Sequence, residues 1–196
     1  MKSYNNLYSQ IISFENLILA WQKARKGKTN KDYVIKFEEE LFYNLLALHY
    51  ELLYNSYQPR PLKSFVIRDP KTRKIHKSDF RDRVVHHAIV NILEPIYEPV
   101  FIFDSFANRL GKGNLKAIER LYYFIRKVSR NGKIKGKFSN NQIKGFYFKA
   151  DIKHYFKEVD HEVLINVLRR KIIENQTLNL LKKIIRTSES RERERK

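Results

Sequence analysis

The chain has 196 residues, enough for one domain or for one domain and part of another. A hydrophobic fraction of 42% excludes wholesale disorder, and the absence of cysteine excludes disulfides, thiolate zinc sites and cysteine nucleophiles. Forty Lys and Arg against 21 Asp and Glu give a formal net charge of +19, which favours a polyanionic partner because bound phosphates release condensed counterions.

Residues 1–57 are predicted to be helical. Ser13 is a suitable cap for a first helix, whose apolar face consists of Leu17, Ala20, Trp21 and Ala24. A second helix is indicated by apolar residues three or four positions apart, at Phe37, Leu41, Leu45, Leu48 and Leu52. Such stripes are typical of a core. The basic connector 25–31 is interpreted as a solvated loop, with phosphate contact as the alternative.

Two short strands are predicted at 62–68 and 73–77, joined by the turn 69–72. The hairpin carries a series of cations: Lys63, Arg68, Lys71, Arg73, Lys74 and Lys77. Crowded cations repel one another unless an anion lies between them, and the guanidinium fork fits phosphate oxygens. We therefore favour phosphate contact over the alternative, a solvated hairpin.

A helix is predicted from Asp82, and Pro95 is expected to bend or end it. The adjacent His86 and His87 point to different faces of that helix, so they are interpreted as packed or surface histidines. Further along, residues 111–113 read Gly-Lys-Gly before another predicted helix, a position at which backbone amides can hold a phosphate. The glycine spacing is not that of a Walker loop.

Residues 146–151 read as an aromatic and β-branched strand that ends in the carboxylate of Asp151. Asp160 is then expected to cap a helix with an apolar face at Leu164, Val167, Leu168 and Ile172. A short helix at 178–185 follows, an exposed basic loop is expected at 130–144, and the charged end 188–196 is expected to fray. A carboxylate on a rigid strand end suits Mg²⁺, whereas the alternative is an aspartate that merely ends a strand.

Taken together, these segments resemble the front half of a bacterial reverse transcriptase, with the group II intron and diversity-generating retroelement branch as the nearest type. The segments that carry the resemblance lie within about residues 57–173, in the family's order: Arg73-Lys74-Ile75-His76, Phe80 through Ile89, Leu93-Glu94-Pro95-Ile96-Tyr97, Ser105 through Arg109 with Gly111-Lys112-Gly113, Ala150-Asp151-Ile152 through Phe156, and Asp160-His161.

The resemblance implies an α+β fold, the fingers and partial palm of a right-hand polymerase. Its expected parts are a helical N-terminal region at 1–57, fingers with a basic β-hairpin at 58–145, the start of the palm at 146–187 with an incomplete antiparallel palm sheet, and a charged frayed end at 188–196. The expected activity is RNA-directed DNA synthesis, in which two Mg²⁺ ions stabilise the attacking 3′-oxygen and the leaving pyrophosphate.

The resemblance also assigns roles to residues at the metal site and beside it. Asp151 would be the catalytic, metal-binding aspartate, and the backbone carbonyl of Ile152 would help to hold Mg²⁺. Phe156 would be the aromatic gate that excludes ribonucleotides. Asp160 matches a family position but is better explained as a helix cap.

Other roles belong to the fingers. Arg73, with help from Lys71 or Arg68, would grip the triphosphate of the incoming dNTP. Arg109 and Lys112 would contact the template or the nucleotide. The partners implied are an RNA template, a DNA or RNA primer, and dNTPs.

The sequence departs from the family at the second acidic element. It contains no Tyr-x-Asp-Asp turn, no Asp-Asp pair and no glycine–serine segment before such a turn. We therefore expect a fragment of a longer enzyme, inactive as a polymerase by itself and poorly soluble because an apolar strand edge is exposed. The alternative is a noncatalytic RNA-binding module from a degenerate or split retroelement protein.

No membrane partner is indicated by the sequence. The first residues lack the apolar core of a signal peptide, no run approaches the length needed to span a bilayer, and no long basic amphipathic helix stands out. An anionic membrane surface therefore ranks behind a nucleic acid as the partner. We expect a cytoplasmic protein.

Overall fold

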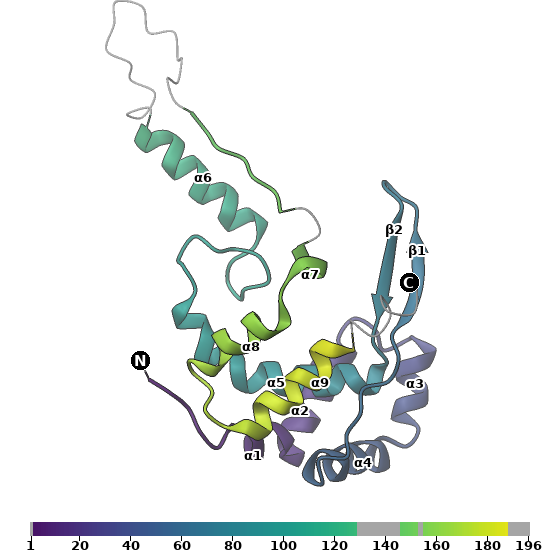
Figure 1. The fold of residues 1–196 in the computed structure, drawn as a ribbon. Helices are drawn as coiled ribbons and strands as arrows, with labels where there is room; N and C mark the ends of the chain where they lie inside the picture. Colours follow the sequence, from purple (N-terminus) through teal and green to yellow (C-terminus); the bar gives the residue numbers. More distant parts are fainter. Residues whose placement is uncertain (1, 129–145, 153–154, 188–196) are drawn as a thin grey trace, which may run out of the picture. The chain divides into compact units, whose positions relative to one another are not determined.

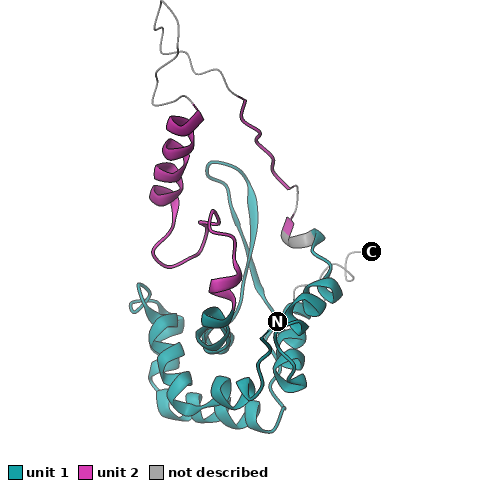
Figure 2. Ribbon diagram, turned by 90° about the vertical axis from the view of Figure 1, so that its left-hand side faces the viewer, with its two compact units in different colours: residues 1–96, 158–196 teal, residues 97–157 magenta. Residues whose placement is uncertain are grey.

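A computed structural model describes residues 2–128, 146–152 and 155–187 (Figure 1). These residues form helices and one two-stranded antiparallel sheet, so the coarse prediction of mixed α and β structure is confirmed. The chain divides into two compact units (Figure 2). Unit 1 consists of Met1–Ile96 with Glu158–Lys196, and unit 2 consists of Tyr97–Lys157.

The first helices of unit 1 are α1 (Leu7–Ile12), α2 (Phe14–Arg25), α3 (Asp32–Glu38) and α4 (Leu41–Leu53). The predicted cap of α2 is confirmed, because the Ser13 hydroxyl accepts a hydrogen bond from the Asn16 amide at 3.2 Å. Leu17, Ala20 and Ala24 are buried as predicted. Helix α1 packs against α2 and α4, and α4 packs against α2 and α3.

The second predicted helix is interrupted, which corrects the expectation of one continuous element. Helix α3 ends at Glu38, and Glu40 has non-helical backbone angles before α4 begins. The side-chain amide of Asn44 donates to the Phe37 carbonyl at 2.9 Å, so an acceptor at the end of α3 is satisfied without a continuous helix. The predicted core stripe survives the break, since Phe37, Leu45, Leu48 and Leu52 are buried.

The predicted hairpin is confirmed as β1 (Lys63–Ile67) and β2 (Arg73–Lys77). The strands are antiparallel, with Phe65 opposite Ile75, and the hairpin projects from the helices of unit 1 (Figure 1). Helix α5 (Phe80–Tyr97) follows and buries Val84, Val85, Ala88, Ile89 and Leu93. Pro95 lies inside α5, which ends two residues later and is followed by the 3₁₀ helix η1 (Glu98–Val100).

The segment after unit 2 returns to the N-terminal helices. Helices α8 (His161–Arg169) and α9 (Asn175–Arg186) pack against each other, and α9 packs against α1. A parallel bridge joins Tyr4 to Ile172, in which the Tyr4 amide donates to the Lys171 carbonyl at 2.7 Å. The Tyr8 amide donates to a Glu174 carboxylate oxygen at 2.6 Å. Residues more than 160 positions apart in sequence are thus joined in one core.

Asp160 caps α8 as predicted. Its carboxylate accepts hydrogen bonds from the amides of Glu162 and Val163, at 2.8 and 3.0 Å. The predicted apolar face is wrong in part, because α8 ends at Arg169 and Ile172 lies beyond it in the bridge to Tyr4. The fully buried side chain of α8 is Ile165.

Unit 2 contains helix α6 (Asn114–Val128), the loop before it, and most of the short helix α7 (Tyr155–Glu158). None of its described residues is buried. Helix α6 has an exposed apolar face formed by Leu115, Ile118, Leu121, Tyr122 and Val128. Lys116, Arg120 and Tyr123 lie on a different face, because residues three or four positions apart share one side of a helix.

The predicted strand at 146–151 does not form, which is a correction. Residues 146–152 have no regular secondary structure, and Phe146, Tyr147 and Phe148 are each more than 90% exposed. A strand needs a neighbour for its backbone amides and carbonyls, and no other described segment supplies one. The expected palm sheet is therefore absent from the described residues, whose one sheet is the β1–β2 hairpin.

Two sequence predictions, the basic loop at 130–144 and the frayed end at 188–196, lie outside the described residues. Among the helices that are described, none combines the length and the apolar character needed to cross a membrane.

Candidate nucleic-acid interface

The hairpin presents cations on both faces and at its tip. Side chains alternate along a strand, so the register puts Lys63, Lys77 and Arg73 on one face, and Lys74 on the other. Lys63 is directly opposite Lys77, an arrangement that repels unless an anion is near. In the described part of the chain, no ion pair with an acidic residue neutralises these cations.

The residues predicted to grip a triphosphate lie close together at the hairpin tip. Arg68 and Lys71 are in the turn between the strands, and Arg73 is the first residue of β2. All three are exposed. A concentration of cations on a projecting element is suited to phosphate groups, because Arg and Lys donate hydrogen bonds and supply charge.

The hairpin is attached to the helices at its base by Tyr33 of α3. The Lys77 ammonium lies 3.7 Å from the centre of the Tyr33 ring, and the Arg83 guanidinium lies 4.7 Å from it. Although slight burial raises the pKa of Tyr33, the hydrogen bonds and charges of Arg83 and Lys77 outweigh it and lower that pKa overall. These contacts restrain the base of the hairpin and leave its tip exposed.

Arg109, predicted to contact template or nucleotide, closes the loop between η1 and α6. Its guanidinium forms a two-pronged pair with the Glu98 carboxylate, at 2.6 to 3.1 Å, and donates to the carbonyls of Ile102 and Ser105 at 2.9 and 3.0 Å. Its side chain is 9% exposed. Hydrogen bonding from Arg109 lowers the pKa of Glu98. The geometry gives Arg109 a structural task, and its predicted nucleic-acid contact stays a prediction.

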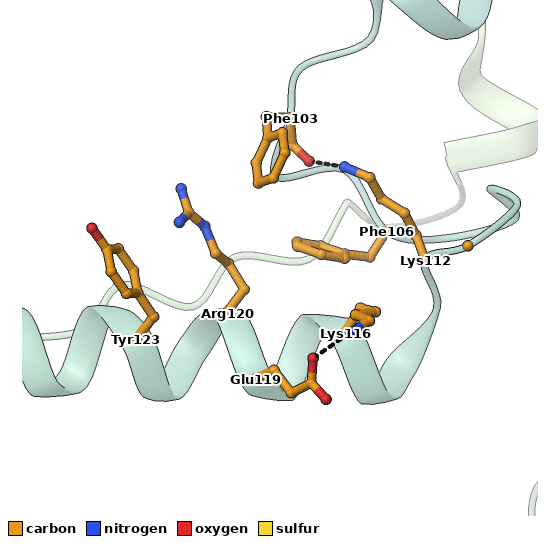
Figure 3. A pocket seen from close by; sticks show the side chains of 8 residues that line it. Phe103, Phe106, Lys112, Lys116, Glu119, Arg120 and Tyr123 are labelled. Atoms are coloured by element: carbon orange, nitrogen blue, oxygen red, sulfur yellow. Dashed lines mark hydrogen bonds and ion pairs between the residues drawn. The ribbon is translucent and has the colours of Figure 1, made fainter.

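Lys112 lies in a pocket of unit 2 (Figure 3). Its ammonium donates to the Phe103 carbonyl and lies 4.2 Å from the Phe103 ring centre and 5.1 Å from that of Phe106. From helix α6, the Arg120 guanidinium lies 5.1 Å from the Phe103 ring and 4.9 Å from the Tyr123 ring. Aromatic rings and cations therefore alternate around one concave site.

The residues assigned to catalysis are less organised. Asp151 and Ile152 lie in the exposed segment 146–152, and Asp151 has no hydrogen bond or ion pair within the described part of the chain. The described residues also contain no group of three His, Asp or Glu side chains that could hold a metal. One carboxylate and one carbonyl would be only part of a ligand set for Mg²⁺, which commonly takes one or two carboxylates together with phosphate oxygens. Phe156 lies in α7, and its side chain is outside the described part.

The sequence interpretation did not identify Phe103, Phe106, Arg120 and Tyr123 as site residues. A signal was present in the recurrence of Lys116, Arg120 and Tyr123 at helical spacing, away from the apolar stripe of α6. Phe103 and Phe106 gave no such signal, because they reach the pocket only when the loop folds onto α6.

Comparisons with known proteins give relatives that include a group II intron-encoded protein and intron maturases. Over 192 residues the chain is 24% identical to the group II intron-encoded protein LtrA of Lactococcus lactis, covering 93% of this chain and 29% of the relative. It is 30% identical over 129 residues to nuclear intron maturase 2, mitochondrial, of Arabidopsis thaliana, which covers 57% of this chain and 17% of the relative. An uncharacterized mitochondrial protein of Marchantia polymorpha is 32% identical over 111 residues, which cover 55% of this chain and 13% of the relative.

No family model matches the chain. These similarities confirm the predicted resemblance to reverse transcriptases of the group II intron type. The chain spans between 13% and 29% of the length of these three relatives.

Proposed function

We propose that this chain forms the fingers and the first part of the palm of an RNA-directed DNA polymerase of the group II intron type. The observation that carries the proposal is the similarity over 93% of the chain to a group II intron-encoded protein. A match of that extent spans residues 57–173, in which the motifs of the family occur in order. The net charge of +19 supports an RNA partner.

In this proposal the hairpin and Asp151 have different tasks. Arg68, Lys71 and Arg73 bind phosphates of the incoming dNTP or of the RNA, because they are exposed cations without acidic partners in the described residues. Asp151 contributes one carboxylate to a magnesium site. Bound there, the ions would supply charge neutralisation for nucleotidyl transfer. The additional acidic ligands that two ions require are not among the motifs of this chain.

A noncatalytic RNA-binding module is the second candidate. It is favoured by the lack, within the described residues, of a group of three side chains that could hold a metal, and by relatives that are named as intron maturases. The two candidates share the RNA partner and differ in whether Asp151 is needed for a reaction.

Removing hairpin charge tests the shared part of the proposal. The double variant Arg73→Gln/Lys74→Gln is expected to weaken binding of single-stranded RNA and to flatten the dependence of log K on log salt, by about 0.7 for each phosphate that the variant no longer neutralises. Fluorescence anisotropy across a salt series measures both effects with the full 196-residue chain.

The matched control is Lys36→Gln/Arg169→Gln, which removes the same charge from exposed residues of unit 1 that lie outside the hairpin. It is expected to keep most of the affinity. Equal losses of affinity in the two double variants would mean that RNA responds only to total charge, and the hairpin would not be the binding element.

The catalytic part is tested in the reading frame after the codon for Lys196. An in-frame glycine–serine segment followed by Tyr-x-Asp-Asp would support the polymerase, and Asp151→Ala in that polypeptide should abolish DNA synthesis while sparing RNA binding. A stop codon at that position would favour the noncatalytic module. The purified 196-residue chain is expected to incorporate no dNTPs on a primed RNA template, so incorporation would contradict its predicted inactivity.

A further inference from the structure

None of the residues that line the pocket of unit 2 belongs to the hairpin or to the segment that contains Asp151. Its volume is about 370 Å³, which falls within the usual range for small-ligand sites. The loop before α6 and the first turns of α6 form its walls, through Phe103, Phe106, Lys112, Lys116, Arg120 and Tyr123 (Figure 3). All of these residues belong to one compact unit.

The aromatic rings of the pocket are open to a ligand. Phe103 is 68% exposed and Tyr123 is 51% exposed, although burial of such rings is favourable. Figure 3 shows the Arg120 side chain between Tyr123 and the two phenylalanines, and Lys112 on the other side of Phe106. Contacts between cations and ring faces restrain the rings, so they are arranged for stacking before any ligand arrives.

The charge of the pocket is only partly neutralised. Lys116 pairs with Glu119 at 2.8 Å, and Arg120 pairs with Asp104 at 2.7 Å. Lys112 differs, because its ammonium donates to a neutral acceptor, the Phe103 carbonyl. In the described residues no carboxylate forms an ion pair with Lys112. The Lys112 charge helps to lower the pKa of Glu98, but that carboxylate is paired with Arg109, so the ammonium can also bind an anion beside the exposed rings.

Exposed rings next to a cation that has no ion-pair partner in the described residues match one nucleotide unit of a single strand. A base can stack on an aromatic ring only when its own face is exposed, as it is in single-stranded RNA and not inside a duplex. The adjoining phosphate then lies within reach of a lysine. Because Phe103 and Tyr123 are more than half exposed, the strand can continue past the pocket on either side.

We propose that this pocket binds one unstacked nucleotide of a single-stranded RNA, with the base against Phe103, Phe106 and Tyr123 and the phosphate at Lys112. The inference rests on the proposed function for its choice of RNA as the polyanion. It adds a second RNA contact, selective for single strands, to the hairpin contact, which depends on charge alone.

Removing the aromatic faces tests the pocket. In the full chain, Phe103→Leu/Tyr123→Leu is expected to raise the Kd for a single-stranded RNA at least about tenfold, because base stacking on each ring contributes at this level. The Kd for a duplex of the same length should stay within about twofold. The matched control is Phe42→Leu/Tyr43→Leu, which alters a Phe and a Tyr of α4 that are also more than half exposed, and it should leave both Kd values unchanged.

A crosslinking measurement on the unaltered chain keeps the test independent of how the variant folds. Single-stranded RNA that carries 4-thiouridine should crosslink to the peptides around Phe103 and Tyr123, as mapped by mass spectrometry. Crosslinks that all map elsewhere would overturn the pocket, as would an equal weakening of single-strand and duplex binding in the Leu variant.

The hairpin and the pocket can be refuted separately. If Arg73→Gln/Lys74→Gln weakens RNA binding and the pocket variant does not, the pocket alone is refuted. If the hairpin variant binds normally and the pocket variant binds single strands more weakly, the hairpin assignment is refuted and the pocket stands. If the unaltered chain binds neither single-stranded RNA nor the duplex, both the pocket and the proposed function are refuted.

Discussion

Asp82 of α5 is a carboxylate buried among hydrogen-bond donors. It is 1% exposed, and its oxygens accept from the Tyr57 hydroxyl at 2.9 Å and from the Arg60 amide at 2.8 Å. Arg81 pairs with Asp82 at 3.4 Å and also with Glu51 of α4. Burial, followed by the Asp82 charge, raises the pKa of Tyr57. These bonds attach the segment after α4 to the start of α5, and so position the base of the hairpin.

Tyr57→Phe is expected to lower the free energy of unfolding by about 1 kcal/mol, because Asp82 loses one of its donors but keeps the others. Asp82→Ala should cost more, since Tyr57 and the Arg60 amide would then lack their acceptor. Urea unfolding followed by circular dichroism measures both. Tyr54→Phe, at a 72% exposed tyrosine, is the control and should be neutral.

His86 makes the stability of the chain depend on pH. Burial is the largest cause that lowers the pKa of His86. The folded chain therefore protonates this imidazole at a lower pH than the unfolded chain, in which the pKa of a histidine is about 6.5. As the pH falls below about 6.5, the unfolded state gains protons that the folded state does not, and the free energy of unfolding decreases.

The melting temperature is therefore expected to fall between about pH 7.5 and pH 5.5. Burial and nearby lysines also lower the pKa of His87, so His86→Gln/His87→Gln should flatten this dependence. His76→Gln, on the exposed hairpin, is the control and should keep the wild-type slope. A double variant with the wild-type slope would show that other groups govern the pH response.

At the scale of elements, the loop between η1 and α6 depends on Arg109 because unit 2 has no buried described residue. Arg109→Lys keeps the charge but cannot reproduce the fork to Glu98 together with the bonds to Ile102 and Ser105. Hydrogen exchange should become faster at the amides of Lys112 and Gly113, which are bonded within this loop. Amides of unit 1 helices should not change, and their acceleration would contradict a local role.

Elements with local signals were predicted well from the sequence. The caps at Ser13 and Asp160 and the turn after Arg68 depend on residues within a few positions, and the structure has all three. The prediction of a strand at 146–151 was wrong, because a strand needs a partner strand to form and no local sequence pattern shows whether one is present. The return of α8 and α9 to the N-terminal helices was also not predicted, since it depends on contacts such as Tyr4 with Ile172.

The candidate site also contains residues that local sequence signals predicted and residues that they did not. The cations of the hairpin were predicted, because a turn with basic flanks is visible in the sequence. The aromatic half of the pocket was not, because Phe103 and Tyr123 come together only when the loop folds onto α6. The arrangement around Asp151 stays a prediction.

Taken over the whole molecule, apolar surface is exposed in several places of unit 2, including α6 and the segment 146–148. Leu115, Ile118 and Leu121 extend along one face of α6, and the segment 146–148 presents Phe, Tyr and Phe. Exposed apolar areas of this kind promote association in water.

The purified chain is expected to self-associate at micromolar concentrations, and Ile118→Lys/Leu121→Lys should reduce the effect by placing charge on the α6 face. Sedimentation velocity measures the distribution of species. The control Tyr43→Lys adds charge at an exposed position of α4 and should leave association unchanged. A wild-type chain that sediments as a single monomeric species would contradict the expectation.

Unit 1 is built from two stretches of the chain that are separated by unit 2, so it cannot complete its folding early during synthesis on the ribosome. The N-terminal helices emerge first, but Ile172 and Leu178, which complete their core, are made only after all of unit 2. During this interval the surfaces of α1 that later meet α9 remain open to solvent or to other polypeptides. The nascent chain therefore passes through a long stage with an unfinished core, in which a chaperone that covers apolar surface would raise the yield of folded protein.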